Sequence, residues 1–367
     1  MKKILIVLLI CVVSISSFAT IKLAALMPMT GSVAAFGRMI YNGIELANEL
    51  FPTVNGEEIE VVLLDNKSDK VEAVNTARRA IEVENVVAIL GEVISGNTIA
   101  GGAVAEESKV PMVSPSSTTP LVTQDKEYVS RVCFSDPFQG LAAAILAYEI
   151  MGLDNTAIFI DVEQDYAVGF ANYFKQKAED LGKNYFYEYY KSGDQDFTAQ
   201  ISDAIAKNAG AFFIPGYYQE IALIASQARQ LGFYEPILAG DGAAVPETIE
   251  IGGDAVNNLY FTTHYDPGAP NTTENAKLFV EKYTEKFGEA PGTFTALGFD
   301  TYMVVRDAIE RAGSSDPEMI AKAIRETVEF PGATGFITID ENGDAIKSVA
   351  IVKIEDGEFV YSTTVNP

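Results

Sequence analysis

Near-continuous apolar segments alternate with amphipathic helical segments along most of this chain, and this alternation constrains its fold more than any other feature. The first apolar segments are 21–29, 59–67 and 86–90, and a helical pattern follows each of them. Strands that are apolar on both faces are typical of parallel sheets covered by helices on both sides. Segment 69–84 is one such helix, and its apolar residues at helical spacing are Val71, Val74, Ala77 and Ile81.

The same pattern restarts near residue 136, with apolar segments at 156–162, 211–218 and 236–241. About 350 mature residues exceed one typical core, so two domains are expected. Three more helical segments then indicate a return to the first unit, and a β-like pair at the C-terminus is expected to complete the second. We predict two doubly wound parallel-sheet lobes, joined by several chain crossings that act as a hinge around a ligand cleft. The expected boundaries are 20–136 plus 265–340 for lobe 1 and 137–264 plus 341–367 for lobe 2.

Residues 1–19 have the pattern of a secretory signal peptide. Two lysines precede an apolar core, and 17–19 (Ser-Phe-Ala) forms a small-x-small cleavage site. Cleavage near Ala19 is favoured over lipid attachment at Cys11, because Ile10 stands where a small residue is expected before a lipidated cysteine. No later segment reaches the ~20 apolar residues of a membrane span. We therefore expect a soluble protein exported to the periplasm.

The charge and cysteine content exclude several partners. The chain has 26 Lys and Arg against 51 Asp and Glu, and loss of Lys2 and Lys3 lowers the formal net charge from −25 to −27. Such a charge opposes binding to nucleic acid or to an anionic membrane. Without Cys11, Cys133 has no cysteine to pair with, so it is expected in the core. We expect a monomer with no metal and no cofactor.

Hydroxyl side chains gather in the segment 91–120. Ser95 stands where a helix is expected to begin, which would make it the N-cap and leave neighbouring N–H groups free to attract an anion. Adjacent strand ends of an open α/β sheet share one crevice, so a second cluster is expected beside Ser95 and the two would hold a carboxylate. This second cluster consists of Ser114, Ser116, Ser117, Thr118 and Thr119.

Two other interpretations of these hydroxyls stay open. Ser and Thr at strand ends commonly satisfy hydrogen bonds of loops and helix caps. Segment 91–98 (GEVISGNT) also approaches the phosphate-loop motif GxxxxGK[ST], but Asn97 replaces its lysine, which opposes nucleotide binding.

No sequence motif predicts catalysis. The patterns HExxH, CxxC and GxSxG do not occur. His264, the single histidine, is placed in a presumed crossing between lobes rather than at a sheet edge, and we expect it to be structural. Asp161 and Glu163, near Tyr166, are interpreted as loop acids of an acidic protein rather than as a carboxylate pair or metal site. We predict that the chain is not an enzyme.

Six short motifs in register resemble type I periplasmic binding proteins, and most closely the leucine/isoleucine/valine-binding branch that serves ABC importers. The resemblance covers nearly the whole mature chain. It implies the two-lobed fold, an amino acid as ligand and a membrane permease as partner. In chain order the motifs are MTGSVAAFG (29–37), GEVISGNT (91–98), SPSSTTP (114–120), VEQDYAVGF (162–170), IPGYYQE (214–220) and LAGDGA (238–243).

The resemblance also implies ligand-binding residues. Ser95 and Thr118 match positions that hold the ligand α-carboxylate, and Ser116 matches a position whose backbone contacts the ligand. Asp241 matches the acid that faces the α-ammonium, and Tyr217 matches a tyrosine that joins the polar contacts on closure. A zwitterion needs such donors at one end and an acceptor at the other. The positions lining the side-chain pocket are matched by Phe36, Ile94, Tyr166 and Phe294.

Two residues depart from the family pattern. Asp241 stands where close relatives have Glu, so a water or a shifted ligand would bridge the missing methylene. Phe36 replaces a Tyr or Trp and lacks its polar tip. The predicted ligand is a zwitterionic amino acid, branched-chain and aliphatic, without a choice among individual amino acids. One alternative is a ligand-sensing receptor for an amide, urea or an aromatic acid, and another is a secreted hydrolase. Asp241 disfavours those ligands of the receptor that lack an ammonium.

Overall fold

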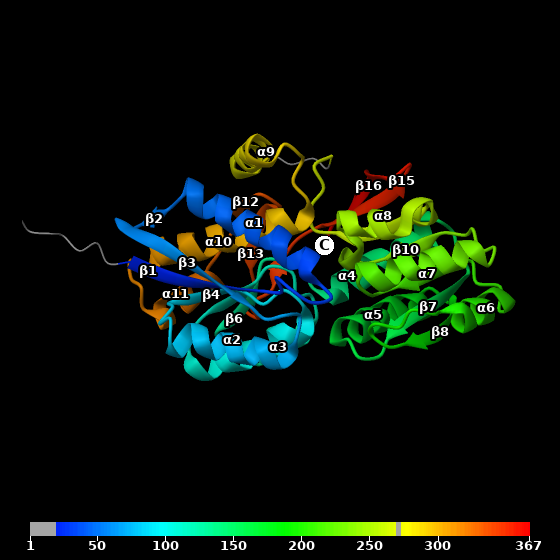
Figure 1. The fold of residues 1–367 in the computed structure, drawn as a ribbon, viewed down its shortest axis with the longest axis horizontal. Coiled ribbons are helices and arrows are strands. Elements are labelled where there is room, and N and C mark those ends of the chain that lie inside the picture. Colours follow the sequence, from blue (N-terminus) through cyan, green and yellow to red (C-terminus); the bar gives the residue numbers. More distant parts are fainter. Residues whose placement is uncertain (1–19, 269–272) are drawn as a thin grey trace, which may run out of the picture.

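The computed structural model describes residues 20–268 and 273–367, so the predicted signal peptide and Cys11 lie outside the described residues. Two lobes lie side by side, each built on one sheet with helices on both faces (Figure 1). The predicted α/β architecture of two parallel-sheet lobes is therefore confirmed.

The first sheet has the strand order β2-β3-β1-β4-β5-β6. All its strands pair in parallel except β2, which is an antiparallel edge strand. The strands are β1 (Thr20–Met27), β2 (Thr53–Val54), β3 (Glu57–Asp65), β4 (Ala88–Gly91), β5 (Met112–Ser114) and β6 (Val129–Arg131). The helices that follow its strands are α1 (Ala34–Leu50), α2 (Lys70–Glu82) and α3 (Ser95–Ser108).

The central strand β1 shows why its sequence is apolar throughout. Leu23 and Ala25 point into the core shared with α1, whereas Ala24 and Leu26 point into the core shared with α2 and α3. Successive strand residues face opposite sides of a sheet, so a strand covered on both sides has no polar face.

The second sheet has the order β16-β15-β11-β10-β9-β7-β8. Strands β7 to β11 pair in parallel, and the C-terminal hairpin of β15 and β16 adds two antiparallel strands beside β11. The strands are β7 (Asn155–Asp161), β8 (Asn184–Tyr190), β9 (Ala211–Ile214), β10 (Ile237–Ala239), β11 (Leu259–Thr263), β15 (Val349–Glu355) and β16 (Glu358–Val365). Its helices are α4 (Asp136–Ile145), α5 (Asp165–Asp180), α6 (Thr198–Ala206), α7 (Tyr218–Gln230) and α8 (Pro246–Gly252).

After β11 the chain returns to the first sheet, as Figure 1 shows. Helix α10 packs tightly across α1, because a Cβ atom at Gly43 would lie 2.0 Å from the Thr295 carbonyl oxygen and one at Gly298 would lie 2.0 Å from that of Ile40. Only glycine allows the two backbones to approach this closely. The returning elements are α9 (Glu274–Phe287), α10 (Thr293–Ala312), α11 (Pro317–Arg325), β12 (Phe330–Gly332), β13 (Gly335–Ile339) and β14 (Ala345–Ile346).

Strands β12, β13 and β14 form a small third sheet in the first lobe, so among the described strands the chain passes between the two lobes after β6, after β11 and between β14 and β15. Several crossings side by side restrict relative motion of the lobes to a hinge. The residue boundaries given above for the lobes stay a prediction.

Helix α2 buries only part of the face that its apolar residues suggested, since Ala77 and Ile81 pack against the core. The buried residues of α2 are Ala73, Thr76, Ala77 and Ala80, whereas Val71 is 66% exposed. Helix α2 packs closely against α3, and small side chains fit this contact better than large ones. Packing against a neighbour has overridden hydrophobicity here.

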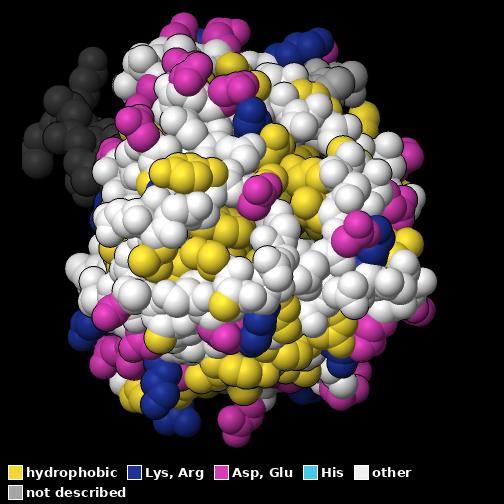
Figure 2. Space-filling model, turned by 90° about the vertical axis from the view of Figure 1, so that its right-hand side faces the viewer, with side chains coloured by type: hydrophobic (Ala, Val, Ile, Leu, Met, Phe, Trp, Pro, Cys, Tyr) yellow, Lys and Arg dark blue, Asp and Glu magenta, His cyan; other side chains and the backbone are white. Residues whose placement is uncertain are grey.

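Across residues 20–268 and 273–367, every helix is too short or too polar to cross a membrane. Acidic side chains are dispersed over the end of the molecule that carries the second sheet (Figure 2). Lys and Arg side chains lie among them, so this face has no large patch of one charge.

Candidate functional site

A narrow cavity of about 20 Å3 lies between the two lobes. This is the room of about one water molecule, so the surrounding side chains nearly fill the site in this structure. The structure brings together around it all nine residues that sequence analysis selected, and their contact with a ligand stays a prediction. The lining consists of Phe36, Val93, Ile94, Ser95, Ser116, Thr118, Tyr166, Tyr217, Asp241, Gly242 and Phe294.

Helix α3 points its N-terminus at the cavity. Ser95 is the first residue of α3 and not its N-cap, which is Ile94, so the predicted capping role is wrong. The Ser95 hydroxyl instead accepts a hydrogen bond from the Thr119 N–H at 3.4 Å. The first N–H groups of a helix have no partner within the helix, and they give this end of α3 a partial positive charge beside Ser95.

Hydroxyls of the second cluster bind the backbone of the neighbouring loop, between β4 and α3. The Ser114 hydroxyl donates to the Glu92 carbonyl at 2.7 Å, and the Ser116 hydroxyl donates to the Val93 carbonyl at 2.8 Å. The alternative of loop hydrogen bonds therefore holds for these two side chains. Thr118 lines the cavity from the same loop.

Asp241 supplies a carboxylate from the opposite lobe. It follows β10, and its Oδ1 accepts hydrogen bonds from Gln139 Nε2 at 2.8 Å and from the Tyr166 hydroxyl at 2.9 Å. Its Oδ2 lies 3.0 Å from His264 Nε2. An ionised carboxylate has about four acceptor positions, so three donors orient it and leave room for one more. Asp241 can therefore accept a hydrogen bond from a cation in the cavity.

The position of His264 differs from the one expected. It directly follows β11 at the carboxyl edge of the second sheet, where it contacts Asp241 and stacks on Phe134 with ring centroids 3.6 Å apart. Burial lowers the pKa of His264, so the imidazole is neutral and orients the carboxylate without neutralising it. The signal in the sequence is that His264 directly follows the segment that forms β11. Because β10 and β11 are adjacent parallel strands, residues just after each of them lie close together.

Asp136 and Gln139 were missed by sequence analysis. Asp136 is the first residue of α4, and its N–H donates to the Thr118 carbonyl at 2.8 Å. Its side chain is buried, close to the side chain of Thr118. Burial raises the pKa of Asp136 to about 8, although hydrogen bonding to the Thr118 side chain opposes this rise, and Asp241 adds a smaller increase. Asp136 is therefore mostly protonated at neutral pH and adds little negative charge beside Asp241.

Aromatic rings form the other walls. Phe36 contacts Phe294 with centroids 4.5 Å apart and Tyr217 at 5.7 Å, and Tyr217 stacks on Tyr166 at 5.5 Å. Burial raises the pKa of Tyr166 and of Tyr217 well above the ordinary value, so both remain neutral phenols. With Ile94, these rings surround the cavity with apolar surface suited to an aliphatic group.

Direct contacts join the lobes in this closed form. The Tyr218 hydroxyl, on α7, donates to the Ser32 carbonyl, which precedes α1, at 2.9 Å. An ion pair joins Lys70 at the start of α2 to Asp165 at the start of α5, with a distance of 2.8 Å. Tyr217 lines the cavity, while its neighbour Tyr218 packs against Phe36.

The remaining candidates for chemistry have structural roles. The Asp161 carboxylate accepts hydrogen bonds from the Ser192 hydroxyl and the Glu163 N–H, as expected of a loop acid. Within the described ranges, no cluster of three or more His, Cys, Asp or Glu side chains is placed to bind a metal ion. Cys133 is buried as predicted, and burial raises the pKa of its thiol to about 12.

Comparison with known proteins agrees with the family resemblance of the sequence motifs. A family model described as periplasmic binding protein matches residues 20–358. The chain is 32% identical over 333 residues to the leucine-, isoleucine-, valine-, threonine-, and alanine-binding protein of Pseudomonas aeruginosa, covering 89% of this chain and 87% of that one.

Two solved structures are similar over the same length. The leucine-binding protein LivK from Thermotoga maritima has 56% identity and a TM-score of 0.93, covering 95% of this chain and 99% of that one. The branched-chain amino acid transporter substrate-binding protein LivJ from Streptococcus pneumoniae, in complex with isoleucine, has 30% identity and a TM-score of 0.90, covering 95% and 100%.

Proposed function

Since the chain belongs to the periplasmic binding protein family and is a binding protein rather than an enzyme, we propose that it delivers a branched-chain, aliphatic α-amino acid to an ABC importer. Leucine, isoleucine and valine are the primary candidates, because the names of the similar proteins refer to these ligands.

The observation that supports an α-amino acid most directly is the polarity of the cavity. Ser95 and Thr118 line it beside the positive end of α3, and Asp241 lines it from the second lobe. An α-carboxylate would bind at the first group and an α-ammonium at the second. A ligand without an ammonium would leave the Asp241 carboxylate facing the cavity without a cation, which is costly in a site closed to water.

Closure of the lobes would couple binding to transport. The two charged ends of the ligand contact different lobes, so the closed form binds it more tightly than an open form does. A ligand shifts such an equilibrium only by its difference in affinity for the two states. The importer's membrane permease would then recognise the closed form.

Binding of defined ligands tests the proposal. Isothermal titration calorimetry is suitable because the chain has no tryptophan whose fluorescence would report binding. We expect leucine, isoleucine or valine to bind with 1:1 stoichiometry. 4-Methylpentanoic acid lacks the ammonium of leucine and leucinamide lacks its carboxylate, so both should bind far more weakly. Tight binding of benzoate or urea, with none of any α-amino acid, would refute the proposal.

Export and assembly complete the proposed function. We expect the mature protein to begin at Thr20 after cleavage near Ala19, to be a monomer and to bind no nucleic acid. Mass spectrometry of protein recovered from the periplasm measures the new N-terminus, and light scattering with and without leucine measures the mass.

A further inference from the structure

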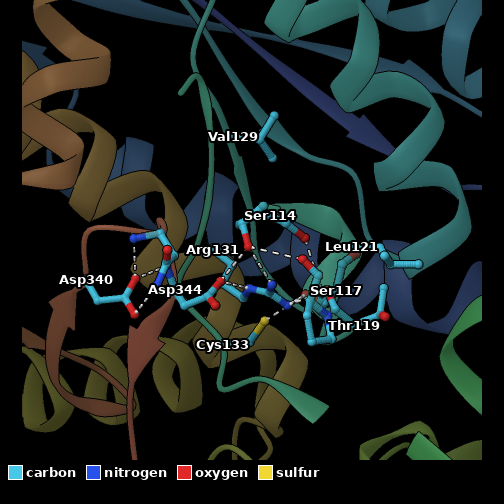
Figure 3. A network of polar contacts seen from close by, with 12 residues as sticks. Ser114, Ser117, Thr119, Leu121, Val129, Arg131, Cys133, Asp340 and Asp344 are labelled. Atoms are coloured by element: carbon cyan, nitrogen blue, oxygen red, sulfur yellow. Dashed lines mark hydrogen bonds and ion pairs between the residues drawn. The ribbon is translucent and has the colours of Figure 1, made fainter. Parts of the chain in front are cut away.

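Arg131 lies at the centre of a polar network behind the hydroxyl loop of the cavity (Figure 3). It is the last residue of β6, and its side chain is fully buried. Its Nη1 donates to the Ser117 carbonyl at 2.8 Å and to the Thr119 carbonyl at 3.0 Å. Its Nε donates to Asp344 at 2.7 Å on the opposite side. The guanidinium thus holds the carbonyl groups of the residues on either side of Thr118.

The peptide between Ser117 and Thr118 connects this cation to the cavity. Its carbonyl oxygen accepts from Arg131, and its N–H belongs to Thr118, which lines the cavity. The bond is trans, so the N–H points opposite to the carbonyl and away from Arg131. Among the described residues this N–H has no hydrogen-bond acceptor.

We infer that Arg131 is a positioning residue of the carboxylate pocket that acts through this peptide group. The Arg131 guanidinium, which donates to the Ser117 carbonyl oxygen, polarises the peptide group between Ser117 and Thr118 and makes the Thr118 N–H a stronger donor. The ligand carboxylate then meets a polarised N–H instead of a free cation, and an arginine in the cavity would compete with the α-ammonium for Asp241. This inference rests on the proposed function.

Two neighbours show that the effect is confined to one N–H group. The peptide after Thr119 leads to Pro120, which has no N–H, so the second Arg131 contact only positions the loop. The Thr118 carbonyl accepts from the Asp136 N–H and not from Arg131, so the Thr119 N–H is an internal reference.

The experiment combines 15N NMR of the ligand-free protein with calorimetry of leucine binding. In Arg131→Met we expect the Thr118 amide nitrogen to shift upfield while the Thr119 amide stays in place. We expect leucine to bind ~10-fold more weakly, the lower end of what outer-shell partners of metal ligands contribute. Arg131→Lys keeps the positive charge but loses the planar set of guanidinium N–H donors. It should give smaller changes in the Thr118 amide shift and in leucine affinity, in the same direction. It replaces the Met variant in both measurements if that variant does not fold.

Asp344→Asn is the matched control. It removes the ion pair on the far side of Arg131 but keeps both carbonyl contacts. We expect a lower melting temperature, an unchanged Thr118 amide and leucine affinity within ~2-fold of the wild type, because neutral hydrogen bonds can replace a partly exposed pair. An unchanged Thr118 amide in the Arg131 variants would overturn the inference, and so would equal loss of affinity in Asp344→Asn. If the wild type binds no α-amino acid, the proposed function fails, and the Thr118 shift still decides the role of Arg131.

Discussion

Replacing Asp241 with asparagine tests the acid in the cavity with little change in shape. The Asn oxygen can still accept from Gln139 Nε2 and Tyr166. The Asn amide can donate to His264 Nε2 once the imidazole proton moves to Nδ1, which has no partner among the described residues. The fold is therefore expected to survive, and only the negative charge is lost.

The size of the effect follows from burial. The Asp241 side chain is 6% exposed, so an ammonium beside it is shielded from water. Breaking a buried ion pair costs ~3–5 kcal/mol, and the dipole of the Asn oxygen recovers part of this, which leaves ~2–4 kcal/mol. At ~1.4 kcal/mol per factor of ten, the dissociation constant for leucine should rise ~30- to ~700-fold.

Calorimetry of Asp241→Asn beside Asp165→Asn checks this reasoning. Asp165 also pairs across the lobes, but the side chains of Lys70 and Asp165 are 51% and 40% exposed, so this pair is screened by water. Its loss should cost at most ~1 kcal/mol, or ~5-fold in affinity. Equal affinities of the two variants would show that Asp241 does not face the ammonium.

Three further variants test other parts of the site. Asp136 keeps its proton in the folded state up to a pKa of about 8, but loses it near 3.8 in the unfolded state. Between these pH values the unfolded state therefore binds fewer protons than the folded state. The stability of the wild type then falls as the pH rises, by at most ~1.4 kcal/mol per pH unit. Asp136→Asn removes this slope, so its advantage in melting temperature over the wild type should grow from pH 4 to pH 8, and a constant difference would contradict the assigned burial. Gly242→Ala would place a Cβ atom 2.1 Å from the Gly216 carbonyl oxygen, so the cavity wall must shift. We expect the affinity for leucine to fall more than ~10-fold. An unchanged calorimetric titration would show that the wall moves without loss of binding. Tyr218→Phe loses the hydrogen bond to the Ser32 carbonyl, which forms only when the lobes are closed. The free energy of leucine binding should therefore weaken by ~0.5–1.5 kcal/mol, with little change in the melting temperature of the ligand-free protein. A large drop in that melting temperature would show that the contact also forms without ligand.

Much of the architecture could be predicted because strand burial is recorded locally. The apolar runs that became β1, β7 and β9 are buried on both faces, and each cause lies within a few residues of its effect. The buried face of α2 could not be predicted in this way, because the close packing of α3 against it selected alanines over Val71.

The candidate site divides in the same manner. Ser95, Thr118 and Asp241 stand within a few residues of strand ends, and the six motifs that resemble a known family placed them at one cleft. Gln139 lies within a helix, and Arg131 ends a short strand, so neither carries a local sign of its function. The Gln139 contact with Asp241 joins residues 102 positions apart, and the buried Arg131 is held against the loop by Asp344, 213 positions away.

By itself, the amino-acid sequence determined which segments become strands and helices, and which hydroxyl, acid and aromatic residues stand at the strand ends. Only the tertiary structure decided how the Asp241 carboxylate is held, by His264 and a helix glutamine, and which peptide Arg131 polarises. The physical reason is range. Hydrophobic periodicity acts between near neighbours in the chain, whereas the orientation of a buried charge depends on every donor that packing brings within ~3 Å of it.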